Sequence, residues 1–204
     1  MPNLFSSDII LENERAQLIP LTLNHLPVLW PIAANPSLWE FTSANIQTYS
    51  DFEAYVNKAL HEKKIGNCYP FAVYDKANNC FAGSTRYGNI SLEHKRVEIG
   101  WTWYHPSLQR SGLNRACKSL LLQYGFEQLN LNRIELKTSL FNTRSQKAIG
   151  DLGATQEGIL RQHMINDNGS VRDTVIFSIL QNEWSTISKT KLHPHAFSPK
   201  STNK

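Results

Sequence analysis

Apolar side chains recur at helical spacing in two early segments of the chain. In residues 52–60 they lie three or four positions apart, and Gly66 marks the end of this expected helix. A Ser-x-x-Glu capping box precedes the pattern, so we expect Ser50 to be the N-cap and Glu53 to bind back to it. Residues 24–34 form a second, shorter expected helix that begins at its asparagine.

Alternation of apolar and polar side chains replaces helical spacing in the middle of the chain. Residues 133–140 alternate in this way, as a strand with one buried face does. The turn-rich segment 75–79 separates two other strands, and a long aromatic strand follows them. The expected extended segments are residues 15–21, 69–74, 81–87, 96–104 and 133–140.

Two further helices and a closing hairpin complete the pattern. Residues 114–129 carry one apolar stripe, which predicts an amphipathic helix. Asn142 is the expected N-cap of a shorter helix that Gly153 ends. The pair Asn168-Gly169 is a strong hairpin signal between strands at 158–164 and 173–180. This order of elements predicts an α/β or α+β domain with a mixed sheet.

Composition places the chain among folded single-domain proteins. It has 204 residues, 41% of them hydrophobic and 19% charged, which excludes a disordered chain and a coiled coil. No apolar run is long enough to span a membrane, and the first residues lack the pattern of a signal peptide, so we expect no membrane partner and a cytoplasmic location. We expect one domain over residues 1–184 and a flexible basic tail over residues 185–204.

The net charge of +4 suggests an acidic partner, but its distribution argues against nucleic acid. All four excess charges are lysines of the tail, so residues 1–184 are formally neutral and show no basic stripe. Three cysteines stand far apart, and the two histidines of the tail are too few for a metal site, so we expect neither a disulfide framework nor a metal.

The most informative stretch runs from Glu98 to Asn114, where a strand leads through a loop into a helix. A helix N-terminus presents unpaired N–H groups and the positive end of the helix dipole, which together suit a phosphate. Gly112 leaves space for such a group, and Arg110 and Arg115 add cationic donors. These features favour a diphosphate cradle, with an ordinary strand-to-helix turn as the alternative.

Several motifs in sequence order resemble the GNAT superfamily of acyl-CoA N-acyltransferases, most closely its RimJ/RimL-type branch. The strand before the loop reads Glu-Ile-Gly-aromatic and is followed by Pro106. The resemblance covers residues 12–184, and its other motifs are Gln109-Arg110-Ser111-Gly112-Leu113-Asn114, Asn142-Thr143-Arg144-Ser145, Leu152-Gly153-Ala154 with Glu157-Gly158, Gly169 with Arg172-Asp173, Phe177-Ser178 and Glu183-Trp184.

The resemblance implies a twisted, mixed and mostly antiparallel sheet flanked by helices. It further implies that acetyl-CoA lies where the fourth strand, residues 96–104, splays from the fifth, residues 133–140. Asn114 departs from the small residue that the family places at the end of the loop, and it either narrows the phosphate bend or caps the helix. The implied cofactor-binding residues are Thr102, Trp103, Tyr104, Gln109, Arg110, Ser111, Gly112, Leu113, Asn114, Arg115 and Asn142.

Acetyl transfer to an amine needs a base, because an amine attacks only when it is unprotonated. Glu98 stands at the position that resembles the catalytic glutamate of the family's histone-acetyltransferase branch. Its alternative roles are an ion pair with Arg96 or Lys95 and a place in the lining of the substrate groove. Ser145 is the candidate proton donor to the leaving sulfur, because Ile149 replaces the tyrosine of many relatives. Its alternative is a serine that satisfies the helix backbone. Tyr104 is a second candidate donor, and water a third.

The acceptor is expected to be a primary amine, most simply a protein N-terminal α-amine. A small-molecule amine (an amino acid, polyamine or aminoglycoside) and a non-catalytic acyl-CoA-binding module are the alternatives. Trp101 is an expected substrate contact, although aromatic residues spaced like Trp101 and Trp103 also occur in cores. Arg161, His163 and Asp173 of the closing hairpin are the other expected acceptor contacts. The sequence leaves a monomer and a homodimer equally open.

Overall fold

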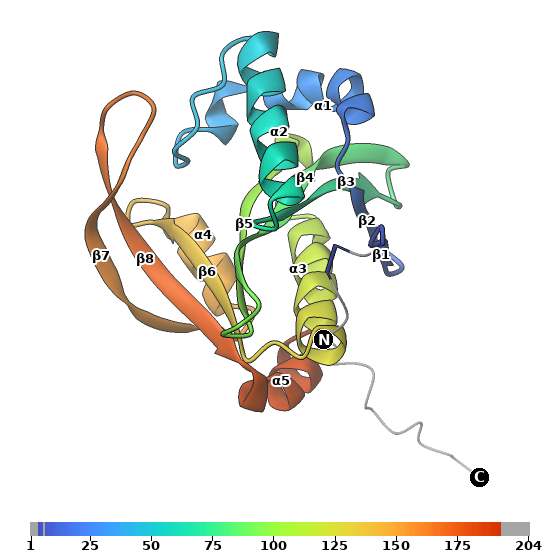
Figure 1. Cartoon of the computed structure of the whole chain (residues 1–204), viewed down its shortest axis with the longest axis vertical. Helices are drawn as coiled ribbons and strands as arrows, with labels where there is room; N and C mark the ends of the chain where they lie inside the picture. Colours follow the sequence, from blue (N-terminus) through green and yellow to red (C-terminus); the bar gives the residue numbers. More distant parts are fainter. Residues whose placement is uncertain (1–3, 6, 193–204) are drawn as a thin grey trace.

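The computed structural model describes residues 4–5 and 7–192, and its centre is one sheet in the order β1-β2-β3-β4-β5-β6-β8-β7 (Figure 1). All neighbouring strands pair antiparallel except β5 and β6, so the expected mixed, mostly antiparallel sheet is confirmed. The strands are β1 Leu11–Glu12, β2 Ala16–Pro20, β3 Tyr69–Asp75, β4 Cys80–Ser91, β5 Arg96–Tyr104, β6 Arg133–Ser139, β7 Thr155–Ile165 and β8 Val171–Leu180.

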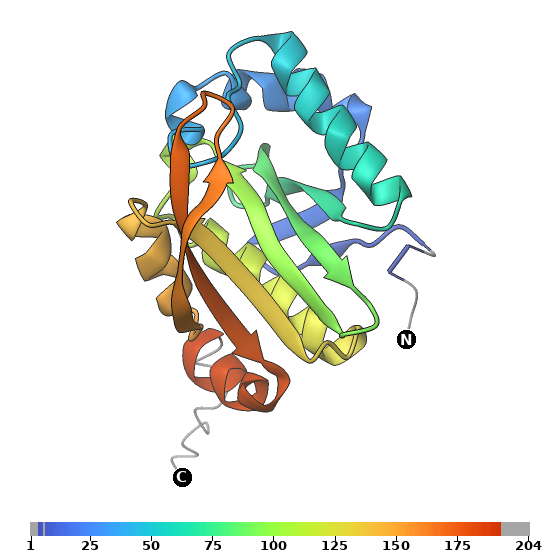
Figure 2. The same cartoon turned by 60° about the vertical axis from the view of Figure 1, so that its left-hand side comes forward.

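Helices cover both faces of the sheet (Figures 1 and 2). Phe71 and Val73 of β3 pack into the core shared with α3, whereas Ala72 between them packs into the core shared with α1 and α2. A third cluster joins α4 to β6 and β8. The α-helices are α1 Leu26–Ala33, α2 Tyr49–Lys64, α3 Leu113–Gln123, α4 Thr143–Gly150 and α5 Gln181–Ile187; short 3₁₀ or π segments are η1 Leu23–His25, η2 Pro36–Leu38, η3 Pro106–Leu108, η4 Tyr124–Gln128 and η5 Ser188–Leu192.

The parallel strands β5 and β6 part soon after they begin. They pair only over Arg96–Glu98 on β5 and Arg133–Glu135 on β6. Beyond these positions β5 continues to Tyr104 and β6 to Ser139 without pairing to each other. We call this separation the splay; it is the feature that the family resemblance implies between the fourth and fifth expected strands.

The N-terminal ends of the first two helices differ from the sequence prediction. Thr48, not Ser50, is the N-cap of α2, and Asp51 takes the place expected for Glu53. Thr48 Oγ1 accepts from Asp51 N at 3.2 Å, and Thr48 N donates to Asp51 Oδ2 at 2.8 Å. Two capping boxes overlap in this sequence, and the earlier one lengthens the helix by two residues. The expected helix at 24–34 begins as η1, which Thr22 caps, before α1 starts.

The C-terminal part of the folded domain extends further than predicted. Residues 185–192, expected in the flexible tail, instead lie in α5 and η5. Ile187 is buried, and Trp184 just before it stacks on Phe126 with ring centroids 5.4 Å apart. The prediction followed polar composition and missed Ile187 as an apolar anchor of this segment. The rest of the expected tail, residues 193–204, lies outside the described residues.

Candidate active site

The loop between β5 and α3 exposes the N-terminus of an eleven-residue helix. Gly112 is the N-cap residue, with φ of 86°, a left-handed conformation that disfavours any residue with a Cβ. No atom lies within 4 Å of the position that a Cβ would take here, so the surface is open. The expected N-cap alternative for Asn114 is therefore wrong, because Asn114 already lies in the first turn of α3.

Hydrogen bonds fix the shape of this loop from beneath. Ser111 Oγ donates to Leu108 O at 2.6 Å and accepts from Arg15 Nη2 at 3.2 Å. Arg15 also pairs with Asp75, which is fully buried. Arg110 has φ of 61° and directs the backbone into the turn. Leu113 N donates to Ser111 Oγ at 3.4 Å. The next N–H groups of the first turn of α3 thus stand on a braced loop and fit a diphosphate.

The cations around the loop are arranged differently from the prediction. Arg115 Nη2 donates to the carbonyl oxygens of Asp151 at 3.2 Å and Lys191 at 2.6 Å, so this side chain ties α3 to α4 and η5. Arg144 was not expected in the site, yet its Nη1 donates to Gln109 Oε1 at 2.9 Å. The Asn-x-x-Ser motif could have pointed to Arg144, because the motif places residue 144 in the first turn of α4.

Three consecutive residues of β5 form one wall of the splay. The indole of Trp103 packs among Trp39 and Phe52, and the ring of Tyr104 packs in the core shared with α3. Thr102 Oγ1 lies 2.7 Å from Thr85 Oγ1 and 2.8 Å from Lys118 Nζ. These side chains are engaged within the protein, so the backbone groups of Thr102, Trp103 and Tyr104 are what this wall offers to a ligand.

The hydroxyl of Tyr104 lies in the core, where it faces Cys117. Burial raises the pKa of Tyr104 well above its ordinary value. The same burial separates the hydroxyl from water that could return a proton to it. This placement speaks against Tyr104 as the proton donor.

Glu98 lies at the last paired position before the splay opens and is 7% exposed. Its Oε2 accepts from Lys137 Nζ and from Asn89 Nδ2, both at 2.8 Å. Its Oε1 faces Gly100, where an added Cβ would lie 3.1 Å from that oxygen. The alternative partner considered from sequence, Arg96, instead pairs with Glu135.

Asn142 is the N-cap of α4, as predicted. Its Oδ1 accepts from Ser145 N at 3.0 Å, so this oxygen serves the helix. The Ser145 side chain is half-buried, and its hydroxyl makes no hydrogen bond to any residue that the structure describes. Ile149 is buried with Leu136 and Phe177 beneath the sheet, which accounts for an apolar residue at that position.

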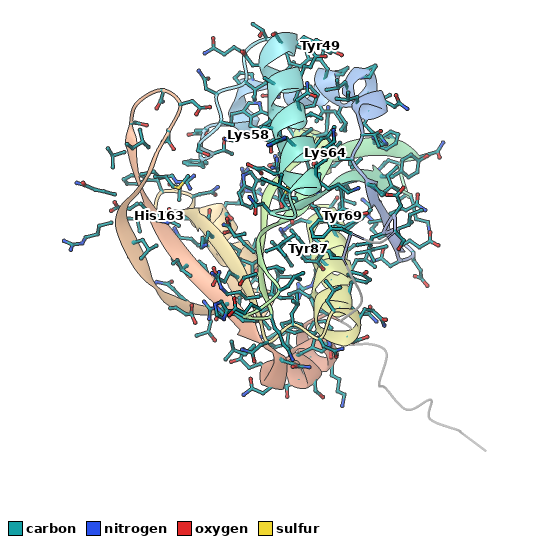
Figure 3. The ribbon with its side chains drawn as sticks, in the orientation of Figure 1. Tyr49, Lys58, Lys64, Tyr69, Tyr87 and His163 are labelled. Carbon is teal, nitrogen blue, oxygen red and sulfur yellow. The ribbon has the colours of Figure 1, made fainter. Side chains whose placement is uncertain are left out.

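The expected acceptor contacts divide into exposed and structural residues. Trp101 is 37% exposed, has φ of 49°, and lies over the Arg86 guanidinium, 5.1 Å from the ring centroid. Arg161 and His163 are exposed on β7, where Figure 3 labels His163. Asp173 Oδ1 accepts from the N–H of Gln162 at 2.7 Å, which supports a strand irregularity between β7 and β8.

The tip of the β7–β8 hairpin is tied to the segment that follows α1, as Figure 2 shows. Asp167 N donates to Ser43 O at 3.0 Å, and Asp167 Oδ2 accepts from Asn45 N at 3.1 Å. Arg172 Nη1 donates to Phe41 O at 3.1 Å. We call these three bonds the hairpin tie. Sequence reasoning missed it because its partners stand more than 120 residues apart.

Neither a metal cluster nor a membrane-spanning helix is found among the described residues. Within residues 4–5 and 7–192, no three or more His, Cys, Asp or Glu side chains are grouped as metal ligands. In the same part of the chain, no helix is both long enough and apolar enough to cross a bilayer.

Comparisons with known proteins agree with this geometry. Residues 15–155 match the acetyltransferase (GNAT) domain family. The chain is 26% identical over 157 residues to the uncharacterized N-acetyltransferase YnaD of Bacillus subtilis (strain 168), covering 77% of this chain and 88% of that protein. It is 27% identical over 179 residues to the uncharacterized N-acetyltransferase p20 of Bacillus licheniformis, covering 86% of this chain and 98% of that one.

Solved structures show the same fold. A GCN5-related N-acetyltransferase from Brucella melitensis superposes with a TM-score of 0.83 and 28% identity, covering 91% of this chain and 84% of that one. Mycobacterium smegmatis RimJ in complex with CoA-disulfide superposes with a TM-score of 0.72 and 21% identity, covering 86% and 88%. The chain therefore belongs to the GNAT family, and it is an N-acetyltransferase that uses acetyl-CoA.

Proposed function

We propose that this enzyme acetylates the α-amine of protein N-termini by direct attack in a ternary complex. The placement of Glu98 carries the proposal. Its Oε2 is held by Lys137 and Asn89, and its Oε1 is left to accept a proton from the attacking amine or from an intervening water. Gly100 keeps the space beside Oε1 open.

An N-terminal α-amine needs less help from a base than a lysine side chain does. At pH 7, about one α-amine in ten is already unprotonated, against fewer than about one lysine amine in a thousand. A single carboxylate that takes the proton is therefore sufficient for an N-terminal acceptor.

We infer that the acceptor enters beside the β7–β8 hairpin. The hairpin tie holds this hairpin against residues 41–45. Arg161 and His163 of β7 and Trp101 of β5 are exposed and available to the acceptor. The name of one relative points to a ribosomal acceptor. A Bacillus subtilis relative, YdaF, is named as a ribosomal N-acetyltransferase and is 30% identical over 96 residues, covering 47% of this chain and 51% of YdaF.

The cofactor side of the reaction follows from the braced loop. When bound, acetyl-CoA supplies the acetyl group as an activated thioester. The first-turn N–H groups of α3 would hold its diphosphate, with Arg110 and Arg144 adding positive charge. Backbone groups of Thr102 to Tyr104 would bind along the splay, and Ser145 would pass a proton from solvent to the leaving sulfur.

The acceptor assignment is tested with three matched substrates. The full chain is incubated with acetyl-CoA and a peptide with a free N-terminus, the same peptide with a blocked N-terminus and a free lysine, or a panel of polyamines and aminoglycosides. Intact-mass analysis should show acetylation of the free N-terminus at a kcat/KM at least about tenfold above the others. Preferred acetylation of a lysine or of a small amine would contradict the proposal.

A further inference from the structure

Lys118 is a buried cation that the reaction described above does not use. It lies in α3, and the whole residue is only 6% exposed. Its Nζ donates to Thr102 Oγ1 at 2.8 Å. An ammonium has three hydrogen-bond donors, and within residues 4–5 and 7–192 no carboxylate lies within 4.0 Å of this one.

A buried ammonium without an ion-pair partner is costly for a folded protein, so its presence calls for a reason. Burial lowers the pKa of Lys118 to about 8, while Cys117 beside it and Glu98 on β5 oppose that effect. The group is therefore mostly charged at neutral pH, although it lacks a close negative partner. Two of its donors remain for a ligand.

The neighbour of Lys118 shows where that ligand would lie. Thr102 belongs to the part of β5 that has separated from β6, and it forms the wall of the splay. Thr102 Oγ1 also bonds Thr85, so Lys118 stands directly behind this wall on the side of α3. We propose that the Lys118 ammonium stabilises the negative charge on the sulfur that leaves during acetyl transfer.

The charges in the step balance. The amine nitrogen bonds to the carbonyl carbon, the bond from that carbon to sulfur breaks, and its electron pair goes to sulfur. Glu98 takes the proton that the amine loses and later releases it to solvent. Lys118 offsets the charge on the sulfur without losing its own proton, and solvent returns a proton to the sulfur through Ser145. The inference rests on acetyl transfer as proposed above, but not on the identity of the acceptor.

The test compares two ligands that differ only in the sulfur. CoA carries a thiol with an ordinary pKa of about 8.5, and desulfo-CoA has none. Binding of each to the full chain is measured by calorimetry from about pH 6 to about pH 7.5, where the Lys118 ammonium keeps its proton. We expect the affinity ratio of CoA to desulfo-CoA to rise by about tenfold across this range, because a cation near the sulfur favours the thiolate.

Three variants assign the effect to Lys118. Lys118→Met should abolish the rise in the ratio and lower kcat, with little change in the KM for acetyl-CoA. Thr102→Val should keep the rise, because it removes the hydrogen-bond partner but not the charge. Lys58→Met, which removes an exposed lysine of α2, should match the unchanged protein.

Other outcomes would overturn the inference. If the affinity ratio of CoA to desulfo-CoA stays flat with pH in the unchanged protein, Lys118 does not stabilise the charge on the sulfur. No variant is needed for that conclusion. A rise that survives in Lys118→Met rules it out as well, even if both ligands bind more weakly. Failure to acetylate N-termini with the rise intact would contradict only the acceptor assignment, whereas failure to bind either ligand would contradict both proposals.

Discussion

The Lys137 ammonium of β6 lies 2.8 Å from Glu98 Oε2 of β5, and this ion pair joins the two strands at the base of the splay. Glu98 is opposite Glu135 in the last paired position, and Lys137 follows two residues further along β6. Burial lowers the pKa of Lys137, but the two carboxylates beside it raise it above its ordinary value. The proposed base therefore also holds together the strands that form the site.

Glu98→Gln separates these two roles. The glutamine oxygen still accepts a hydrogen bond from Lys137, but the side chain can no longer take a proton from the amine. We expect kcat/KM for an N-terminal peptide to fall about 10²- to 10⁴-fold, the usual contribution of a positioned base. Affinity for CoA, measured by calorimetry, should change little because the diphosphate cradle is intact.

Glu135→Gln is the matched control for this substitution. It removes another carboxylate from Lys137, at 3.1 Å, but leaves the proposed base in place. We expect it to retain most of the activity. Equal losses in the two variants would assign Glu98 to the packing of the splay and not to proton transfer.

Gly112→Ala tests the loop that holds the diphosphate. The φ of 86° costs any residue with a Cβ about 1–2 kcal/mol, although the space around the position is open. We expect urea unfolding to show a loss of stability of that size, together with weaker CoA binding as the loop relaxes. Gly150→Ala in α4 is the control, because it too meets no neighbour but has no positive φ. It should stabilise the protein by about 0.5–1 kcal/mol.

The sequence was sufficient for the parts of the fold that depend on local patterns. The strand over 96–104, the Asn142 cap and the Asn168-Gly169 turn are all observed at the predicted positions. Local patterns were less able to show which of two competing N-cap residues begins a helix. Thr48 and Ser50 both begin capping boxes, and only the packed helix selects the first.

The site was less predictable because its side chains meet across long sequence separations. The partner of Glu98 is Lys137, 39 residues away, whereas sequence reasoning considered its immediate neighbours Arg96 and Lys95. Arg115 was expected at the phosphates but binds carbonyl oxygens of α4 and η5. Nothing in the periodicity of α3 distinguished Lys118 from an exposed lysine on the polar side of the helix.

Asp167→Ala tests the hairpin tie. The substitution removes the acceptor for Asn45 N, which should free the tip of β7–β8 from the segment after α1. One lost hydrogen bond of about 0.5–1.5 kcal/mol corresponds to a roughly two- to tenfold higher KM for the peptide acceptor. The KM for acetyl-CoA should not change. Hydrogen exchange should become faster in the hairpin tip, and Glu93→Ala, an exposed control in the β4–β5 turn, should leave both quantities unaltered.

The three cysteines should differ sharply in reactivity. Burial raises the pKa of Cys68 to about 11 and that of Cys117 to about 12, so neither thiol ionises appreciably near pH 8. Cys80 is half-buried at the start of β4. Since the thiolate is the form that is alkylated, iodoacetamide should add to the native protein once, at Cys80, and three times after unfolding.

Peptide mapping of the alkylated protein locates the label, and Cys80→Ser supplies the control. That variant should remain unlabelled while it is folded and take up two labels in urea. Rapid labelling of Cys117 in the native protein would mean that α3 opens from the sheet, and it would contradict the closed environment that Tyr104 and Lys118 share with it.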